Sequence, residues 1–290
     1  MRIEKAGETG FCFGVKRAIN ILENIAHERG GVETLGPVVH NQQVLKRLAE
    51  IGVRVAKDVD DIQGNTVVIS AHGISTQLEA DIRARQIEII DTTCPFVRRL
   101  QQAARKLSEV GFFVIIYGDS NHVEVKATLG WANNQGTAAL EAKSLTELDH
   151  LPLRIGILSQ TTRIPAHFNE FVKDVIDFAL TRDSELRVID TICHDIRKRQ
   201  AGALELARKV DLMLVIGDRN SANTNRLVEL CSTATKTYLM ETAADIQPSW
   251  LKAQPYIGIT AGASTSEQTI DEVITKLEST SGIDYHNPIS

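Results

Sequence analysis

Residues 91–99 read Asp-Thr-Thr-Cys-Pro-Phe-Val-Arg-Arg, and this pattern decides the fold because it recurs. Residues 190–198 read Asp-Thr-Ile-Cys-His-Asp-Ile-Arg-Lys, and residues 12–17 repeat the later part as Cys-Phe-Gly-Val-Lys-Arg. Each copy has a cysteine, two further residues, a β-branched aliphatic residue and two cations. The copies follow one another at nearly regular intervals. They therefore predict a pseudo-threefold molecule with one thiolate from each repeat at its centre.

The repeat extends well beyond the cysteines. Each cysteine is followed by a stretch with aliphatic residues three and four positions apart, which is typical of an amphipathic helix. These stretches span residues 15–29, 97–110 and 196–209. Two apolar runs that predict strands then follow in every copy: residues 32–35 and 67–69, 113–117 and 155–158, and 212–216 and 256–259. A closing strand leads into the next cysteine at residues 87–90 and 186–189, and residues 2–5 are expected to fill that place beside Cys12.

Strands that alternate with helices predict an α/β fold with parallel sheets. We expect three similar α/β domains in a pseudo-threefold arrangement around a central iron–sulfur cluster. Their predicted bounds are residues 12–93, 94–192 and 193–280, with residues 1–11 closing the third repeat and residues 281–290 forming a tail. Ligands of parallel sheets bind beyond the carboxyl ends of the strands, where the three cysteines and the polar loops fall.

Composition excludes several classes of function. The net charge of −5 gives no electrostatic reason to expect nucleic acid or an anionic membrane as partner. The start of the chain lacks the apolar stretch of a signal peptide, and no apolar run approaches the ~20 residues of a membrane helix. Four dispersed cysteines are typical of a reducing compartment, so we expect a cytoplasmic protein.

Three thiolates indicate an iron–sulfur cluster more than a zinc site. Zinc sites usually close with four ligands. Thiolate is the usual ligand of iron–sulfur clusters, and three thiolates would leave one iron of a cubane open for chemistry. The fourth cysteine, Cys231, lies in an amphipathic pattern over residues 226–231 and is predicted to be a small buried apolar residue.

The strand-end loops carry neutral hydrogen-bond donors. Related positions hold His40, His72 and His122 in the first two repeats, and Ser221, Asn223 and Ser264 in the third. Several of these loops run directly into helices, whose N-termini present unpaired N–H groups and partial positive charge. Such a cavity suits a phosphate or a diphosphate.

One carboxyl accompanies these donors. If His122 and Glu124 are extended, their side chains point to the same side, and Glu124 beside an anion would hold its proton and could donate it. The alternative is an exposed pair at a strand edge. For Thr161 and Thr162 the alternative is that they cap the N-terminus of a helix, with Arg163-Ile-Pro165 following.

Other signatures are missing from the sequence. A zinc deaminase would require Pro-Cys-x-x-Cys after the His-x-Glu pattern, and this is absent. Neither common nucleotide-binding glycine motif is present. Electrons would therefore come from a separate carrier protein.

Eight motifs in order carry a resemblance that covers about residues 1–280. They are Gly10-Phe-Cys-Phe-Gly-Val-Lys-Arg-Ala, Gly36-Pro-Val-Val-His-Asn, Ser70-Ala-His-Gly, Asp91-Thr-Thr-Cys-Pro, His122-Val-Glu-Val, Ser159-Gln-Thr-Thr, Asn220-Ser-Ala-Asn and Ala261-Gly-Ala-Ser. The chain resembles the 4-hydroxy-3-methylbut-2-enyl diphosphate reductase family, which catalyses the last step of the methylerythritol phosphate route to isoprenoids. The resemblance implies a [4Fe–4S] cluster, an external electron donor such as ferredoxin or flavodoxin, and reductive removal of an allylic hydroxyl to give isopentenyl and dimethylallyl diphosphates.

The resemblance also implies roles for individual residues. Cys12, Cys94 and Cys193 would be cluster ligands. His40, His72, His122, Ser221, Asn223 and Ser264 would contact the diphosphate. Glu124 would relay a proton, and Thr161 would lie beside the substrate hydroxyl.

The chain departs from the family pattern at four places. It has Val123 where proline is usual, Ala222 where a second serine is common, residues 194–197 in place of small neutral residues, and Ser266-Glu267 in place of Pro-Asp. Two alternatives therefore stay open. One is a divergent paralogue that acts on another phosphorylated substrate, and the other is a non-catalytic iron–sulfur redox sensor.

Overall fold

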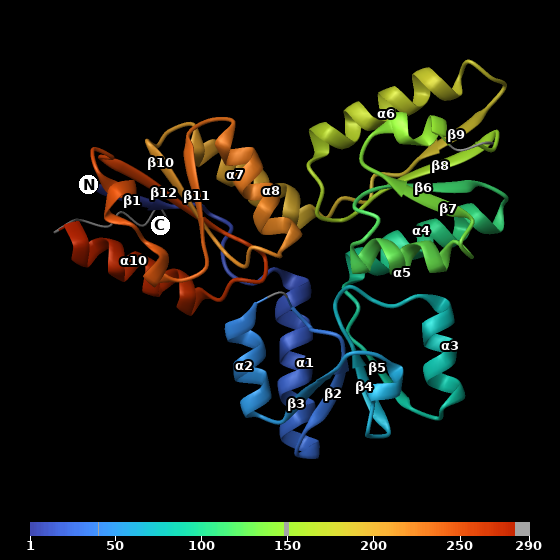
Figure 1. Ribbon diagram of the computed structural model, residues 1–290, viewed down its shortest axis with the longest axis horizontal. Coiled ribbons are helices and arrows are strands. Elements are labelled where there is room, and N and C mark those ends of the chain that lie inside the picture. The colour runs from blue at the N-terminus through green and yellow to red at the C-terminus, as the bar shows by residue number, and fades with distance from the viewer. Residues whose placement is uncertain (40, 148–150, 282–290) are drawn as a thin grey trace. The chain divides into compact units, whose positions relative to one another are not determined.

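The computed structural model describes residues 1–39, 41–147 and 151–281, and its strands form three parallel sheets (Figure 1). The four-stranded sheets have the orders β1-β12-β10-β11, β3-β2-β4-β5 and β7-β6-β8-β9. Every neighbouring pair of strands is parallel. Helices alternate with these strands along the chain, which confirms the predicted α/β class.

The element bounds follow the predicted repeat. The strands are β1 (Arg2–Lys5), β2 (Val32–Leu35), β3 (Val53–Ala56), β4 (Thr66–Ile69), β5 (Glu88–Asp91), β6 (Phe113–Tyr117), β7 (Gly136–Ala139), β8 (Arg154–Ser159), β9 (Glu185–Val188), β10 (Leu212–Ile216), β11 (Lys236–Met240) and β12 (Tyr256–Ala261). The α-helices are α1 (Phe13–Arg29), α2 (Gln42–Glu50), α3 (Thr76–Ala84), α4 (Pro95–Glu109), α5 (Val123–Trp131), α6 (Pro165–Ala179), α7 (His194–Ala207), α8 (Ala222–Ser232), α9 (Pro248–Leu251) and α10 (Glu267–Ser281). Short 3-10 turns span Val59–Asp61, Ala142–Glu147 and Ala243–Asp245.

The described part of the chain divides into two compact units that do not coincide with the three predicted repeats. One unit comprises residues 1–16, 39–50 and 194–290, and the other comprises residues 17–38 and 51–193. The second unit contains two of the three sheets. The three-domain boundaries therefore stay a prediction, and His40 and residues 282–290 of the predicted tail lie outside the described residues.

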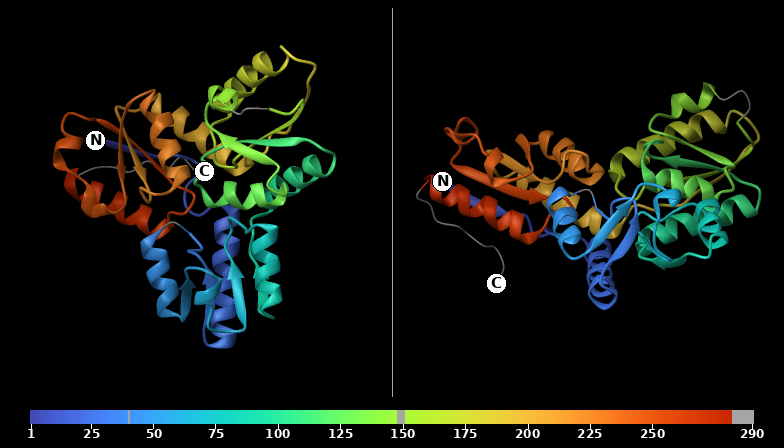
Figure 2. Two further views of the ribbon diagram at one scale, coloured as in Figure 1. Left: turned by 45° about the vertical axis from the view of Figure 1, so that its right-hand side comes forward. Right: turned by 60° about the horizontal axis from the view of Figure 1, so that its bottom comes forward.

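In the first unit, helices cover both faces of the β1-β12-β10-β11 sheet (Figures 1 and 2). Helix α10 packs on one face through Ile270, Val273 and Leu277. Helices α7 and α8 pack on the other face, where Cys231 is fully buried in an apolar cluster, as predicted. Strand β1 lies at the edge of the sheet, with Ile3 opposite Ile257.

In the second unit, the β7-β6-β8-β9 sheet lies between α4 and α6. Leu100, Ala104 and Leu107 of α4 pack on one face, and Phe168 and Phe171 of α6 belong to the core on the other. The β3-β2-β4-β5 sheet of the same unit packs against α3. Trp131 Nε1 at the end of α5 donates to the Ile74 carbonyl at 2.8 Å, which joins the segments around the two sheets.

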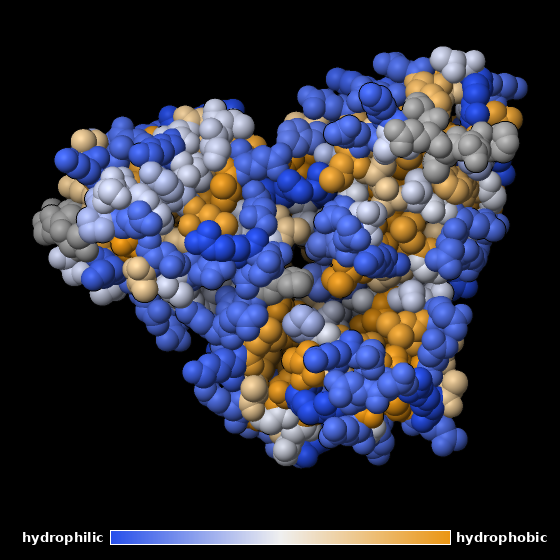
Figure 3. Space-filling model, viewed as in Figure 1, coloured by the Kyte–Doolittle hydropathy of each residue, from blue (hydrophilic) through white to orange (hydrophobic). Residues whose placement is uncertain are grey.

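None of the described helices combines the length and the apolar character that a membrane span requires. On the face drawn in Figure 3, hydrophilic residues cover most of the surface, and hydrophobic residues show in smaller patches between them.

Candidate functional site

The three repeat cysteines share one backbone contact. In each case the cysteine N–H donates to a carbonyl in the loop that follows β12, β4 or β8. The pairs are Cys12 to Ala263, Cys94 to Ala71, and Cys193 to Thr161, each with an N···O distance of 3.0 Å. Each thiol-bearing residue is thus fixed to a strand-end loop that also carries a candidate site residue.

Each cysteine also directly precedes a helix. Helices α1, α4 and α7 begin at Phe13, Pro95 and His194. A helix N-terminus favours a thiolate, because its unpaired N–H groups and dipole are positive. This placement suits thiolates that bind a metal.

Cys12 shows how the local field acts on a thiol. Burial raises the pKa of Cys12, while the Val15 N–H, the Arg199 charge and the Gly14 N–H act in the opposite direction. An ionised Cys12 therefore depends on these positive groups for stabilisation.

Arg199 is a buried cation that the sequence analysis missed. Its side chain is 3% exposed, and its two terminal nitrogens donate to the carbonyls of Ala261 and Gly10, each at 2.9 Å. Burial lowers the pKa of Arg199, and the nearby Cys12 opposes that shift. A thiolate at Cys12 and a guanidinium at Arg199 compensate each other, so this donor environment fits a thiolate-bound metal. The signal in the sequence was the helical spacing of Arg199 from the buried Ala203.

The three-cysteine ligand set itself stays a prediction. Cys94 and Cys193 belong to one compact unit and Cys12 to the other. A metal site needs at least three His, Cys, Asp or Glu side chains close together. Among the described residues of each unit, taken by itself, no such group is found.

Glu124 is buried and bound on both oxygens by one residue. Its side chain is 2% exposed, Oε1 accepts from the Thr161 N–H at 2.7 Å, and Oε2 accepts from the Thr161 hydroxyl at 2.7 Å. Burial raises the pKa of Glu124, and the two bonds from Thr161 oppose the shift. The protonated form of this carboxyl is therefore favoured more than that of an exposed glutamate, which suits a proton donor.

Two expectations about this segment were wrong. His122 has an extended backbone as the N-cap of α5, but Glu124 lies in the first turn of that helix, so the two residues are not both extended and do not form an exposed strand-edge pair. His122 Nδ1 accepts from the Glu124 N–H at 3.2 Å, and this bond satisfies one of the free N–H groups at the helix start.

The capping alternative for Thr161 was also wrong. Helix α6 begins at Pro165, and its N-cap is Ile164, which lies three residues beyond Thr161. The Thr161 hydroxyl binds Glu124 instead, and the Thr161 carbonyl accepts from Cys193. Glu124, Thr161 and Cys193 therefore form one hydrogen-bonded row within a single unit.

The same unit brings His72 and His122 together. Their ring centroids lie 5.6 Å apart at an interplanar angle of 84°. Since Nδ1 of His122 accepts a hydrogen bond, the proton of its neutral ring is on Nε2. Nε2 is thus the donor atom that this ring can offer to an anion.

The other unit contains the third-repeat candidates. Ser221 caps α8, with its hydroxyl accepting from the Thr224 N–H at 3.4 Å. Asn223 in the first turn is 5% exposed, and neither its Oδ1 nor its Nδ2 has a hydrogen-bond partner among the described residues. A buried amide without partners at a helix N-terminus fits a missing polar ligand such as a phosphate.

Ser264 is joined to a residue that the sequence analysis did not single out. Asn41 Nδ2 donates to the Ser264 carbonyl at 2.9 Å, and Asn41 Oδ1 accepts from the Val44 N–H at 3.1 Å, at the start of α2. An asparagine directly before a helical pattern is a common cap and was the available signal. The structural role of its neighbour His40 lies outside the described residues.

Comparisons with known proteins identify the family of this chain. A family model described as "LytB protein" matches residues 3–278. The chain belongs to this family. A 4-hydroxy-3-methylbut-2-enyl diphosphate reductase of Dehalococcoides mccartyi (strain CBDB1) is 58% identical over 278 residues, which are 96% of this chain and 98% of the relative. The enzyme of the same name from Pelobacter propionicus (strain DSM 2379 / NBRC 103807 / OttBd1) is 41% identical over 280 residues, with 96% and 98% covered.

Two solved structures share the LytB-family fold. One is described as (E)-4-hydroxy-3-methyl-but-2-enyl diphosphate reductase, the terminal enzyme of the non-mevalonate pathway. It matches with a TM-score of 0.70 and 37% identity, covering 96% of this chain and 99% of that one. The E-1-hydroxy-2-methyl-but-2-enyl-4-diphosphate reductase from Plasmodium falciparum matches with a TM-score of 0.91 and 26% identity, covering 98% and 91%.

Proposed function

We propose that this chain is a 4-hydroxy-3-methylbut-2-enyl diphosphate reductase that forms isopentenyl and dimethylallyl diphosphates. Family membership and the names of relatives up to 58% identical support the reaction. The observation that carries it is the buried row Glu124–Thr161–Cys193, because it joins the proposed acid to a proposed cluster ligand.

The proposal includes a [4Fe–4S] cluster on Cys12, Cys94 and Cys193. The positions of all three directly before helices and the buried cation Arg199 support this ligand set. When bound, the cluster would supply electrons and an open iron that acts as a Lewis acid on the substrate hydroxyl.

The diphosphate would be held by neutral donors and helix N-termini. We assign this role to His40, His72, His122, Ser221, Asn223 and Ser264. The unpartnered amide of Asn223 and the Nε2 proton of His122 support the assignment. Each hydrogen bond to a charged oxygen contributes roughly 1.5–3 kcal/mol, so several together hold the substrate firmly.

Glu124 and Thr161 would deliver the proton. Burial raises the pKa of Glu124 and so favours its protonated form, and Oε2 lies 2.7 Å from the Thr161 hydroxyl oxygen. For delivery, the Thr161 hydroxyl would turn its hydrogen from Glu124 toward the substrate's allylic oxygen and donate it there, while Thr161 Oγ1 takes the proton of Glu124. The allylic oxygen leaves as water when the C–O bond breaks. In total the reaction consumes two electrons and two protons and forms one C–H bond.

Electrons would come from a separate one-electron carrier protein of the ferredoxin or flavodoxin type. The proposal includes a cytoplasmic location, since thiolate ligands require a reducing compartment. Within residues 1–39, 41–147 and 151–281, none of the four cysteines forms a disulfide bond.

Turnover of the authentic diphosphate tests the proposed function. Anaerobically reconstituted protein with dithionite and methyl viologen should convert it to the two products, as measured by mass spectrometry. Cys193→Ser should abolish conversion, whereas Cys231→Ser, at a buried position outside the site, should retain it. Iron-loaded protein that leaves the substrate unchanged would contradict the proposal and favour a redox sensor or a paralogue with another substrate.

A further inference from the structure

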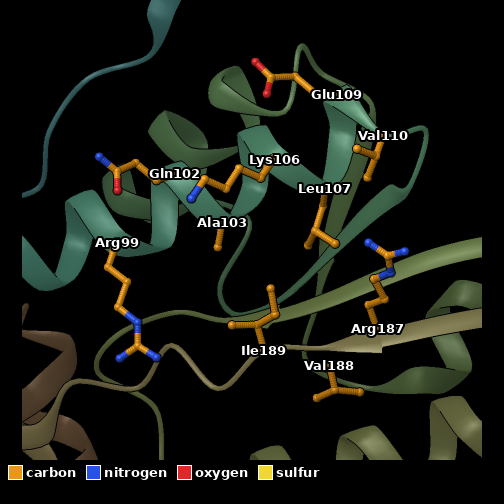
Figure 4. A pocket seen from close by; sticks show the side chains of 10 residues that line it. All are labelled: Arg99, Gln102, Ala103, Lys106, Leu107, Glu109, Val110, Arg187, Val188 and Ile189. Carbon is orange, nitrogen blue, oxygen red and sulfur yellow. The ribbon is translucent and has the colours of Figure 1, made fainter.

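An open groove of about 780 Å³ lies between α4 and β9, within one compact unit (Figure 4). Its lining consists of Arg99, Gln102, Ala103, Lys106, Leu107, Glu109, Val110, Arg187, Val188 and Ile189. In Figure 4, Ala103 and Leu107 of α4 point toward Ile189 across the groove. Val110 and Val188 are 48% and 45% exposed, so the groove presents apolar surface to solvent.

Cations surround this apolar surface. Arg99, Lys106 and Arg187 line the groove, and Arg187 also pairs with Glu185 at 3.1 Å. Glu109 is the one carboxylate among the lining residues. The carboxylate of Glu109 is paired with Arg105, at 2.7 Å. The groove is therefore locally basic on a chain whose net charge is −5, and it would attract an acidic surface.

Both walls of the groove lead to a candidate cluster ligand. Helix α4 begins directly after Cys94, and Arg99 lies about 7.5 Å further along its axis. From the end of β9 at Val188, the chain continues through Ile189 to Cys193. Arg99 joins the two walls, because its Nη2 donates to the Asp190 carbonyl at 3.4 Å.

We propose that the α4–β9 groove is the docking surface for the acidic one-electron carrier protein that reduces this enzyme. The inference rests on the proposed function and adds the place where its electrons arrive. Each encounter oxidises the carrier by one electron, so one turnover needs two encounters to supply the two electrons that break the C–O bond. The two protons of the reaction come from the enzyme and from water.

The physical character of the groove suits such a partner. Redox complexes are small and transient, with less than about 1,200 Å² buried, and complementary charge gives them fast association. A modest apolar centre with three surrounding cations meets both requirements. The groove is also separated by the sheet from α6, which packs on the opposite face.

A charge series at Lys106 tests the proposal. Lys106 is exposed, so Lys106→Met and Lys106→Glu change charge without disturbing the core. The matched control is Lys173→Glu, at an exposed position on α6. The probe is an acidic bacterial ferredoxin, and its binding to the cluster-loaded enzyme is measured by titration calorimetry at low and high salt.

We expect Kd for the ferredoxin to rise in the order wild type, Lys106→Met, Lys106→Glu, by on the order of tenfold over the series at low salt. High salt should reduce the differences. Lys173→Glu should bind like wild type. Equal weakening by Lys173→Glu, or unchanged binding in both Lys106 variants, would overturn the docking site.

Two further measurements distinguish the docking site from the proposed function and from an interface between copies of this chain. With dithionite and methyl viologen, the Lys106 variants should turn over the diphosphate like wild type. If wild type itself fails that assay while ferredoxin still binds at the groove, the proposed function fails and the docking site stands. If Lys106→Glu instead dissociates an oligomer in analytical ultracentrifugation and leaves ferredoxin binding intact, the groove joins copies of this chain and the proposal is wrong.

Discussion

At the scale of single residues, the chemistry depends on how burial acts on one carboxyl. Burial raises the pKa of Glu124, while two hydrogen bonds from Thr161 stabilise its charged form. Glu124 can therefore bind a proton, and the Thr161 hydroxyl is the neighbouring group through which it could transfer that proton. An exposed glutamate would have neither property.

Glu124→Gln should separate proton delivery from binding. Glutamine keeps the shape and can accept from the Thr161 N–H, but it cannot supply a proton. We expect turnover to fall about 10²-fold or more with little change in substrate affinity, the usual scale for general acid catalysis. Steady-state assays with a small-molecule reductant measure both quantities. A variant with normal turnover would make Glu124 a structural residue only.

The Glu124 carboxyl should also affect how the free energy of unfolding depends on pH. The pKa of Glu124 is higher in the folded state than in the unfolded chain, where it is about 4.3. Between the two values the folded state retains a proton that the unfolded state has lost, so the free energy of unfolding decreases as pH rises. Urea unfolding of wild type and Glu124→Gln from pH 4 to 8 measures this. The wild type should lose stability relative to the variant with rising pH, and a constant difference would contradict the assignment.

Asn223 should show opposite effects on binding and on stability. Its buried amide has no partner among the described residues, so Asn223→Leu, of similar volume, removes an unsatisfied polar group. We expect the free energy of unfolding to stay equal or rise by about 1–3 kcal/mol, while KM for the diphosphate increases. Thermal unfolding measures the change in stability, and steady-state kinetics measure the change in KM. Loss of stability with unchanged KM would assign Asn223 to the fold.

At the scale of elements, the sequence predicted the inner strands closely and the outer ones poorly. Strands β6 and β10 have the predicted bounds, because continuous apolar runs are typical of strands buried on both faces. Strands β3, β7 and β11 were not predicted, since they are partly exposed and contain polar or small residues. The start of α5 at Val123 was missed because its cap, His122, is of an uncommon residue type for that position, and the cap depends on a bond from the Glu124 N–H to His122 Nδ1.

The pairing of β1 with β12 makes the first residues of the chain part of a distant sheet. Ile3 is fully buried among residues of β10, β12 and α10. Ile3→Ala should therefore lower the free energy of unfolding by about 2–5 kcal/mol. Val188→Ala, at an exposed position of the edge strand β9, is the control and should change it by about 0.5 kcal/mol or less. Chemical denaturation compares the two, and equal small effects would mean that β1 is not integral to the sheet.

At the scale of the whole molecule, the sequence repeat predicted the equivalent surroundings of the three cysteines but not the division of the chain into two compact units. The equivalent contacts of the three cysteines follow from equivalent sequence, because each lies between a strand end and a helix start. The grouping of residues 39–50 with the third sheet was not predictable, since it depends on contacts such as that of Asn41 with Ser264. No local pattern encodes such a long-range bond.

The most direct test of the central claim is Mössbauer spectroscopy of anaerobically purified protein enriched in the Mössbauer isotope of iron. We expect about four irons per chain, one of them distinct from the rest and altered by adding the diphosphate. Serine at Cys12, Cys94 or Cys193 should remove most of this iron, and Cys231→Ser should retain it, since burial raises the pKa of Cys231 to about 12. Stoichiometric zinc without iron, or an iron signal that the diphosphate does not change, would contradict the account.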